Sequence, residues 1–364
     1  MESIGINLLW LEPGVVGGSE NYTLSLLRAV HDLDPLDLEL VVYGPRSILD
    51  HHPDIGHRFE FVVAPNLPAK RLGRVAAEHT WLSRHTGRHN LMHYAGGVLP
   101  KGAPAQSILT ILDLQPLDMP QNFGRMKRSW LGQMIPRSVD DAKLITVPSM
   151  FTAQRLEELL GVPQEVIRVV PFGVRAASTV QTPIGEKPVV LYPAIAYAHK
   201  RHCDLIDAFV KVRAAVPDAR LVLTGGPGPL TDTVQEQIVS CGLGEFVEIT
   251  GWVSEPEMQE WYSNAAVLAF PSEYEGFGLP VLEAMNHSTP VVVADAGSLP
   301  EIAGPAATVV PVRDPDALAR AIVGILINGE KAASMAVDGA AWASRFTWRR
   351  AGEALISAYR DALV

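Results

Sequence analysis

Two glutamates flank a glycine turn in the stretch FPSEYEGFGLPVLEAM, where they stand eight positions apart. Glu275 precedes the turn and Glu283 lies inside the helical pattern that follows it. Gly276 and Gly278 permit a tight turn and the close approach of a ligand to the backbone. Pro280 suits a first helical turn, because the N–H that it lacks would have no partner there. The stretch therefore predicts a glycine turn that leads directly into a helix.

A turn of this kind can bind a phosphate, because amide groups and the helix dipole converge at a helix N-terminus. The carboxylate of Glu283 can accept hydrogen bonds from both hydroxyls of a vicinal diol such as that of ribose. Glu275 is placed to meet hydroxyls beyond the phosphates. Together the groups describe a site for a nucleotide-sugar; the alternative is a helix-capping turn with solvated glutamates. The predicted phosphate-binding amides belong to Gly276, Phe277, Gly278 and Leu279.

A basic segment, HKRH, follows the strand-like run VVLYPAI and opens a helical pattern. Positive charge is unfavourable at a helix N-terminus, so these cations favour a function over a structural role. Lys200 and Arg201 can neutralise a diphosphate leaving group. The alternative is a solvated basic helix start.

A second glycine turn, GVVGGSE, follows the first strand-like run. Gly17 and Gly18 permit close approach of a ligand, and Ser19 is expected to cap the next helix. The alternative is a tight strand-to-helix turn. The GxGxxG pattern of dinucleotide-binding proteins is absent from this segment.

No metal or other cofactor is expected. The acidic triplets 32–34 and 314–316 end a helical pattern and occupy a turn, so we interpret both as structural. Lysine and backbone amides already offer charge compensation for phosphate. The eleven histidines form no recognisable zinc motif.

Composition narrows the class of protein. The chain has 364 residues, 48% of them hydrophobic, and a formal net charge of −10, which suits two soluble domains and argues against nucleic-acid binding. Cys203 and Cys241 cannot form a disulfide framework, which fits a reducing cytoplasm. The start lacks signal-peptide features, and no window reaches the ~18 apolar residues of a membrane span. We expect a cytoplasmic protein, with peripheral contact at the inner membrane face left open.

Strand-like runs alternate with helical patterns in both halves of the chain, on either side of the turn-rich segment RAASTVQTPIGEKP. Alternation of this kind predicts an α/β protein with two doubly wound parallel-sheet domains. Ligands of such sheets bind beyond the carboxyl ends of the strands, so we expect the site in a cleft between two facing domains.

The motif PSEYEGFGLPVLEAM resembles the E-x7-E signature of retaining glycosyltransferases of family 4, which have the GT-B fold. The segments TPVVVADAGSLPEIAG, GGSENYT, VPSMFTAQRL and LVLTGGPG resemble other parts of that family, and the resemblance runs over nearly the whole chain. It implies a Rossmann-like acceptor-binding domain over 1–178 and a Rossmann-like donor-binding domain over 186–347. It also implies that the final helix, 348–364, crosses back to the first domain.

The resemblance also implies roles for single residues. Lys200 matches the family's phosphate-binding lysine, and Glu275 matches the carboxylate that orients the donor sugar. The glycine loop at Gly17 and Gly18 matches one that faces the donor. Ala194, however, stands where the family usually has an arginine.

A second departure is Leu112, which stands where the family has a histidine that points at the donor sugar. The neighbouring Asp113 is our candidate to cover that role; a helix or turn cap is the alternative. His93 and Tyr94, at a strand end, are candidate acceptor contacts, and the alternative for His93 is a partly buried histidine with satisfied hydrogen bonds.

The implied reaction transfers a hexose, with retention, from a nucleotide-sugar to a hydroxyl of a cell-surface glycan, a glycolipid or a small molecule. GDP-mannose is the first expected donor. A locally basic segment, 68–89, contains Trp81. It is a candidate to face an anionic lipid surface or the acceptor, and the alternative is a solvated helix face. The alternatives to a transferase are another GT-B nucleotide-sugar enzyme, such as an epimerase or phosphorylase, and an inactive nucleotide-sugar-binding relative.

Overall fold

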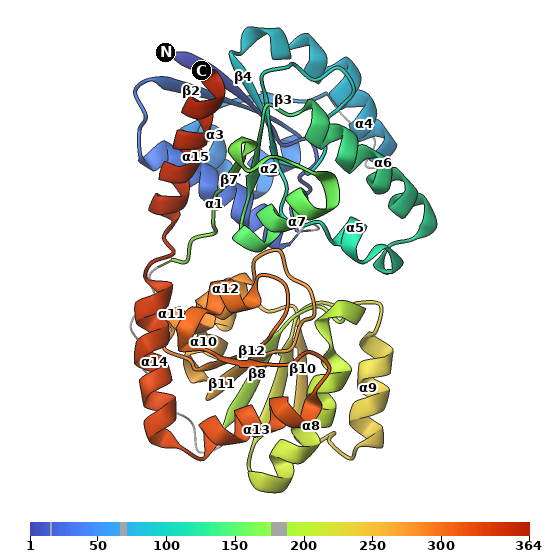
Figure 1. Ribbon diagram of the computed structural model, residues 1–364, viewed down its shortest axis with the longest axis vertical. Helices are drawn as coiled ribbons and strands as arrows, with labels where there is room; N and C mark the ends of the chain where they lie inside the picture. The colour runs from blue at the N-terminus through green and yellow to red at the C-terminus, as the bar shows by residue number, and fades with distance from the viewer. Residues whose placement is uncertain (15–16, 66–70, 176–187) are drawn as a thin grey trace. The chain divides into compact units, whose positions relative to one another are not determined.

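The computed structural model describes residues 1–14, 17–65, 71–175 and 188–364 (Figure 1). The chain forms two compact units. Unit 1 comprises Met1–Gly173 with Thr347–Val364, and unit 2 comprises Val174–Phe346. The predicted domain boundaries, at 178 and 186, lie in or beside the segment 176–187, which is outside the described residues.

Unit 1 is built on a parallel sheet of seven strands in the order β3-β2-β1-β4-β5-β6-β7. The order reverses between β1 and β4. Strand β1 pairs with β2 on one side and with β4 on the other, so that Ile4 lies opposite Leu40 and Leu91. The strands are β1 Glu2–Asn7, β2 Leu38–Gly44, β3 Glu60–Val63, β4 Leu91–Tyr94, β5 Ser107–Thr110, β6 Leu144–Val147 and β7 Ile167–Val169.

Helices connect these strands, as parallel pairing requires. Helix α7 shows how the sequence sets their ends: the Ser149 hydroxyl accepts a hydrogen bond from the Thr152 amide, and Gly161 ends the helix at φ 67°. The helices are α1 Gly18–Asp32, α2 Arg46–His51, α3 Pro53–Arg58, α4 Arg71–Thr80, α5 Gln115–Asp118, α6 Arg125–Asp141, α7 Met150–Leu160 and α15 Trp348–Leu363, with 3₁₀ turns η1 Leu82–Arg84, η2 Thr86–Arg88, η3 Pro120–Asn122 and η4 Gln164–Val166.

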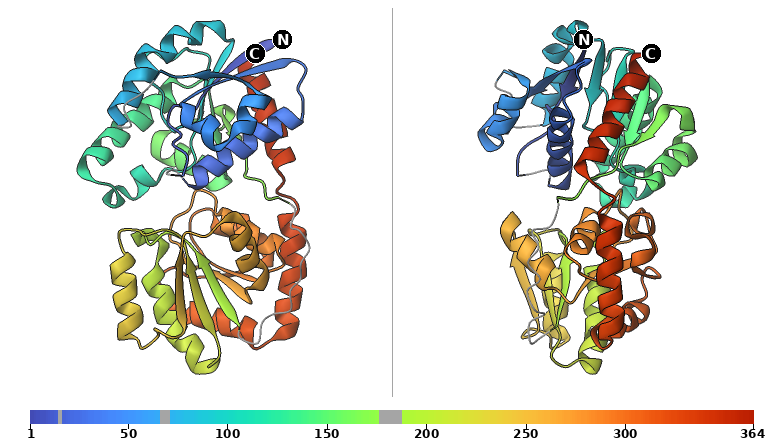
Figure 2. Two further views of the ribbon diagram at one scale, coloured as in Figure 1. Left: turned by 180° about the vertical axis from the view of Figure 1, so that it is seen from behind. Right: turned by 90° about the vertical axis from the view of Figure 1, so that its left-hand side faces the viewer.

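The last helix, α15, packs against α1 and the sheet of unit 1 (Figures 1 and 2). Gly352 of α15 lies so close to Ala29 of α1 that a side chain there would meet the Ala29 backbone at 3.1 Å. At the far end of α15, the Arg360 guanidinium donates two hydrogen bonds to Asp37 at 2.7 and 2.8 Å. The helix following unit 2 therefore belongs to unit 1.

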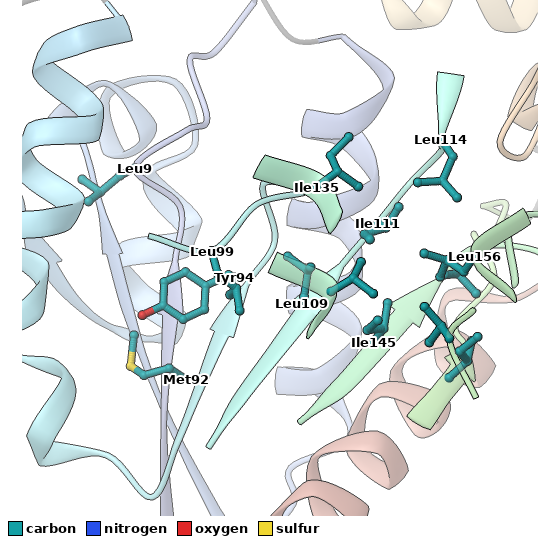
Figure 3. Close-up of a cluster of buried hydrophobic side chains, with 14 of the residues drawn as sticks. Leu9, Met92, Tyr94, Leu99, Leu109, Ile111, Leu114, Ile135, Ile145 and Leu156 are labelled. Atoms are coloured by element: carbon teal, nitrogen blue, oxygen red, sulfur yellow. The ribbon is translucent and has the colours of Figure 1, made fainter. Parts of the chain in front are cut away.

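The structure corrects the prediction that His93 and Tyr94 contact an acceptor. The His93 ring is 3% exposed and lies 2.8 Å from the Tyr359 hydroxyl and 2.7 Å from that of Thr110. Tyr94 is buried in the hydrophobic cluster of unit 1 drawn in Figure 3. Position at a strand end does not determine exposure here, because α15 covers this part of the sheet. We therefore assign both residues to the core.

Unit 2 is a parallel sheet of six strands in the order β10-β9-β8-β11-β12-β13, so its order reverses between β8 and β11. Its strands are β8 Val189–Pro193, β9 Arg220–Thr224, β10 Val247–Gly251, β11 Val267–Phe270, β12 Val291–Ala294 and β13 Thr308–Val310. Its helices are α8 His202–Ala215, α9 Thr231–Ser240, α10 Glu255–Asn264, α11 Leu279–Asn286, α12 Leu299–Ala303, α13 Pro315–Leu326 and α14 Gly329–Ala343, with 3₁₀ turns η5 Ala198–Lys200 and η6 Gly304–Ala306. The predicted pair of doubly wound parallel sheets is confirmed.

Burial lowers the pKa of His93 from 6.5 to about 4. Between these values the unfolded chain binds a proton that the folded chain does not, so stability should fall as the pH falls from 6.5 towards 4. His93→Gln should reduce this slope by about 1.4 kcal/mol per pH unit at most, as measured by denaturant unfolding at a series of pH values. The exposed His57→Gln serves as the control. Equal slopes in the two variants would contradict the prediction.

Candidate active site

The glycine turn between Glu275 and α11 has the predicted form. Helix α11 begins at Leu279 with Pro280 in its first turn, and Gly278 precedes it at φ 98°. A side chain at Gly278 would also meet Leu299 at 2.8 Å. Phe277, between the two glycines, is buried, so its side chain anchors the turn in the core of unit 2. The predicted turn into a helix is thus confirmed.

A buried serine, Ser298, holds this turn from the loop that leads from β12 to α12. The Ser298 hydroxyl lies 2.7 Å from the Phe277 carbonyl oxygen and 3.0 Å from that of Glu275. The Ser298 amide also donates to the Glu275 carbonyl at 3.2 Å. Gly297 precedes it at φ 59°, where an added Cβ would meet the Glu275 nitrogen at 2.8 Å. The sequence of this Ala-Gly-Ser segment shows the family likeness but carries no signal for its contact with the turn, which lies more than 20 positions earlier.

The side chains of Lys200 and Glu275 form an ion pair, with 2.5 Å between Nζ and Oε1. They are only 19% and 13% exposed, so water screens the pair less than it would on the surface. The surrounding backbone is also tied together: the Tyr192 hydroxyl donates to the Lys200 carbonyl at 2.5 Å, and the Glu273 amide donates to the His199 carbonyl at 2.8 Å. The structure thus brings together two predicted site residues that are 75 positions apart.

Arg201 lies beside this pair with its guanidinium engaged elsewhere. Two of its nitrogens donate to the Asp204 carboxylate, each at 2.8 Å. This carboxylate raises the pKa of Arg201 and offsets the unfavourable charge at the start of α8. The backbone of Arg201 is left-handed, at φ 55°, a conformation unusual for a residue with a side chain. Phosphate binding by Arg201, which stays a prediction, would require the guanidinium to leave Asp204.

Glu283 lies on α11, partly exposed, and accepts a hydrogen bond at Oε2 from the Tyr262 hydroxyl at 2.8 Å. Burial raises the pKa of Glu283, and the hydrogen bond from Tyr262 opposes that rise. Oε2 of Glu283 is therefore in contact with a buried tyrosine hydroxyl. Sequence analysis did not identify Tyr262, which carried no signal beyond an apolar helical position.

Unit 2 contains a cavity of about 290 Å³ at the carboxyl ends of β8, β9 and β10. His202 forms part of its wall, and the Nε2–H of this buried ring donates to the Ala194 carbonyl at 3.1 Å. Burial lowers the pKa of His202 to about 4, so the imidazole is neutral at pH 7. The remaining lining residues are Ala196, Leu223, Thr224, Gly225, Gly226, Pro227, Thr231, Val234, Ile249, Thr250 and Gly251.

Unit 1 contains a cavity of about 350 Å³ at the carboxyl ends of β1, β4 and β5, where the strand order reverses. Leu112 and Asp113 both line it, and the Asp113 carboxylate accepts a hydrogen bond from the Gln115 amide at 3.0 Å. Parallel sheets place ligands at this kind of position. The other lining residues are Trp10, Ser19, Ala95, Gly96, Gly97, Val98, Ile111, Gln115, Pro116, Phe123, Lys127, Trp130, Leu131 and Ile135.

The glycine turn at the start of α1 differs from the prediction in one respect. Helix α1 begins at Gly18, with Gly17 as its N-cap at φ 59°, and it has no side-chain cap. The expected cap by Ser19 is therefore wrong, because Ser19 is already inside the helix. Ser19 instead lines the cavity of unit 1, which puts the turn beside that cavity.

Trp81 does not offer a free aromatic side chain to a lipid surface. It is partly buried against the core of unit 1, with its ring centroid 6.0 Å from that of Tyr43. Of the predicted basic segment, residues 68–70 lie outside the described residues.

The described residues contain no group of three or more histidine, cysteine or acidic side chains arranged to hold a metal ion. Of the two acidic triplets, the second has a structural role, because the Asp314 carboxylate accepts a hydrogen bond from the Ala317 amide at 2.8 Å and caps α13. Asp32 of the first triplet pairs with Arg58.

Across the part of the chain that the structure describes, none of the helices combines the length and apolar character needed to cross a membrane.

Two family models match the chain over adjacent segments. The model described as "Glycosyltransferase Family 4" matches residues 16–177, and "Glycosyl transferases group 1" matches residues 175–342. The E-x7-E turn, the glycine turn at α1 and Lys200 fall within these matches. The chain belongs to glycosyltransferase family 4.

Two similar proteins have names that specify mannosyl transfer. The GDP-mannose-dependent α-(1-6)-phosphatidylinositol monomannoside mannosyltransferase of Mycolicibacterium smegmatis is 31% identical over 247 residues, which are 61% of this chain and 64% of that protein. The O-antigen chain mannosyltransferase B of Escherichia coli is 27% identical over 271 residues, or 70% of each chain. The match thus spans slightly less than two thirds of the first relative and slightly more of the second.

Solved glycosyltransferase structures share the fold. HepE from Anabaena, determined with UDP and glucose, has a TM-score of 0.77 at 19% identity and covers 99% of this chain and 100% of that one. A glycosyltransferase from Rickettsia africae has a TM-score of 0.74 at 15% identity and covers 100% and 98%. The chain therefore has the GT-B fold that the sequence predicted.

The contact between Gly297 and the Glu275 backbone yields a stability prediction. Gly297→Ala should lower the free energy of unfolding by about 2–4 kcal/mol, because a side chain is disfavoured at this φ and would clash with Glu275. Gly244→Ala is a matched control, since a side chain there would meet nothing within 4 Å. Denaturant unfolding measures both. A variant at Gly297 as stable as the control would contradict the assigned contact.

Proposed function

We propose that this protein transfers a hexose, with retention of configuration, from a nucleotide-sugar to an acceptor hydroxyl, and that the donor is GDP-mannose. The observation that carries the proposal is the ion pair of Lys200 and Glu275 beside the glycine turn, at the strand-order reversal of unit 2. Family membership supports the reaction class. Both the Mycolicibacterium and the E. coli relative are mannosyltransferases by name, which supports mannose, and the first is named as GDP-mannose-dependent, which supports GDP.

The donor diphosphate binds the amides at the start of α11, from Gly276 to Leu279, and the ammonium group of Lys200. Binding separates Lys200 from Glu275, and the freed carboxylate accepts hydrogen bonds from the sugar hydroxyls. Glu283 accepts the ribose hydroxyls. No metal is needed for this charge compensation, because a cation and a helix N-terminus already face the diphosphate.

In the chemical step, the bond between the anomeric carbon and the phosphate oxygen breaks, and a bond from the acceptor oxygen forms on the same face. The departing phosphate oxygen takes the proton of the acceptor hydroxyl. Lys200 and the amides stabilise the charge that develops on the diphosphate. This route needs no histidine at position 112, where the chain has leucine.

The acceptor is a glycan or glycolipid that binds the cavity of unit 1. Three aromatic residues line that cavity, and their rings offer apolar faces for a sugar ring, while Asp113 offers an acceptor for its hydroxyls. The aromatic residues are Trp10, Phe123 and Trp130.

If the acceptor is a glycolipid, the first turn of α6 contacts the inner face of the membrane that holds it. Arg125, Lys127 and Arg128 are exposed there, around a Met126 that is 89% exposed. Clustered cations around an exposed apolar side chain suit an anionic lipid surface.

A nucleotide-sugar panel tests the proposed donor. GDP-mannose should raise the melting temperature more than GDP-glucose, UDP-glucose or UDP-galactose does. Glu283→Ala should reduce this shift, because the ribose loses its carboxylate partner. The same donor should then be turned over only when a glycan acceptor is added. Turnover of GDP-mannose without any acceptor would indicate an epimerase or hydrolase, and binding without turnover under any acceptor would indicate an inactive relative; either outcome contradicts the transferase.

Glu275→Gln should have opposite effects on binding and on turnover. Loss of the carboxylate frees Lys200 and removes a negative charge near the diphosphate, so affinity for GDP should rise about three- to fivefold. Transfer should fall strongly, because the hydroxyls of the donor sugar lose the carboxylate that accepts their hydrogen bonds. Isothermal titration and product formation measure the two effects.

The control is Glu273→Gln, two positions away, whose carboxylate pairs with Arg313 at 2.9 Å instead of with Lys200. It should leave GDP affinity unchanged. Weaker GDP binding by Glu275→Gln would show that the carboxylate helps to bind the diphosphate, against the proposed exchange.

A further inference from the structure

The hydrogen bond from Tyr262 to Glu283 fixes one of the two carboxylate oxygens. Tyr262 lies on α10, is 1% exposed, and donates to Oε2 at 2.8 Å. A carboxylate can use its two oxygens separately. With Oε2 held by a buried hydroxyl, Oε1 is the oxygen that remains for a ligand on the partly exposed side chain.

Tyr262 is itself held on two sides. Its backbone carbonyl accepts a hydrogen bond from the Thr289 hydroxyl. Its ring stacks on that of His287, with 5.9 Å between centroids and 23° between planes. The His287 ring is in turn held by the Ser263 hydroxyl at 2.9 Å and by the Gln259 side chain at 2.5 Å. This support comes from α10 and from the segment that follows α11, and it leaves the tyrosine hydroxyl little freedom to turn away from Glu283.

We propose that Tyr262 is a positioning residue, which orients Glu283 so that its free oxygen meets the ribose hydroxyls and thereby selects ribonucleotide over 2′-deoxyribonucleotide donors. The inference rests on the proposed function, because it assumes that Glu283 meets the ribose. Without the tyrosine hydroxyl, the carboxylate can rotate and loses a partner for its buried oxygen. Affinity should then fall only for ligands that have the 2′-hydroxyl to which Glu283 would bind.

A purely structural hydrogen bond would behave differently. If Tyr262 only stabilised unit 2, its removal would weaken every nucleotide equally. The distinguishing readout is therefore the ratio of two affinities, for GDP and for 2′-deoxy-GDP, and not either affinity alone.

The experiment measures the Kd of GDP and of 2′-deoxy-GDP by isothermal titration on the full chain. The wild type should prefer GDP by about tenfold. In Tyr262→Phe, the Kd of GDP should rise about fivefold and that of 2′-deoxy-GDP less than twofold. In Glu283→Ala, the preference should vanish, and adding Tyr262→Phe to it should change neither Kd.

Tyr192→Phe is the matched control. Tyr192 is another buried tyrosine of unit 2, and its hydroxyl donates to the Lys200 carbonyl, at the phosphate end of the proposed donor. This variant should weaken both nucleotides by the same factor and keep the preference. It also controls for the loss of a buried hydroxyl, since thermal unfolding of the two variants reports any common loss of stability.

The outcomes separate this inference from the proposed function. A preference for GDP that Glu283→Ala removes but Tyr262→Phe keeps would overturn the role of Tyr262 and leave the proposed function standing. If Tyr262→Phe lowered the affinities for GDP and 2′-deoxy-GDP by the same factor, the role of Tyr262 would also be overturned and the proposed function would stand. Absence of any binding of either nucleotide to the wild type would overturn the proposed function itself.

Discussion

The site depends on the ion pair between Lys200 and Glu275, which joins the segments that follow two neighbouring strands. Lys200 follows β8 and Glu275 follows β11, and these strands lie side by side where the strand order of unit 2 reverses. At a reversal, the connections of the two strands run to opposite sides of the sheet, which leaves room beyond the strand ends. The pair keeps two opposite charges close together in a place where each alone would be costly to bury.

The backbone around the pair is fixed by residues that carry no charge. Ser298, at the N-cap of α12, holds the carbonyls of the glycine turn, and Tyr192 on β8 holds the carbonyl of Lys200. Because the main chain is fixed, the long lysine side chain is the part best able to move. A ligand can thus exchange partners with Lys200 without rebuilding the turn, which is the property that a donor site needs for repeated binding and release.

The sequence predicted local features well and contacts between distant segments poorly. The turn into α11 and the two parallel sheets could be inferred from patterns within a few positions, and the same patterns made Lys200, Glu275 and Glu283 candidate site residues. The partner of Glu283 could not, since Tyr262 lies on another helix. A buried His93 was only the alternative to an acceptor contact, because the choice between them depends on Tyr359, which is 266 positions away.

The two departures from the family pattern each fall on the wall of a cavity. Leu112 lines the cavity of unit 1 and Ala194 lines that of unit 2. In each case an apolar side chain stands where the family has a basic one. Each cavity therefore lacks a side chain that could donate hydrogen bonds, and its wall is more apolar. The neighbouring polar groups remain: Asp113 beside Leu112, and His202, neutral and bonded to the carbonyl of Ala194. The chain therefore keeps the charged residues beside the glycine turn and departs from the family pattern at the walls of the two cavities.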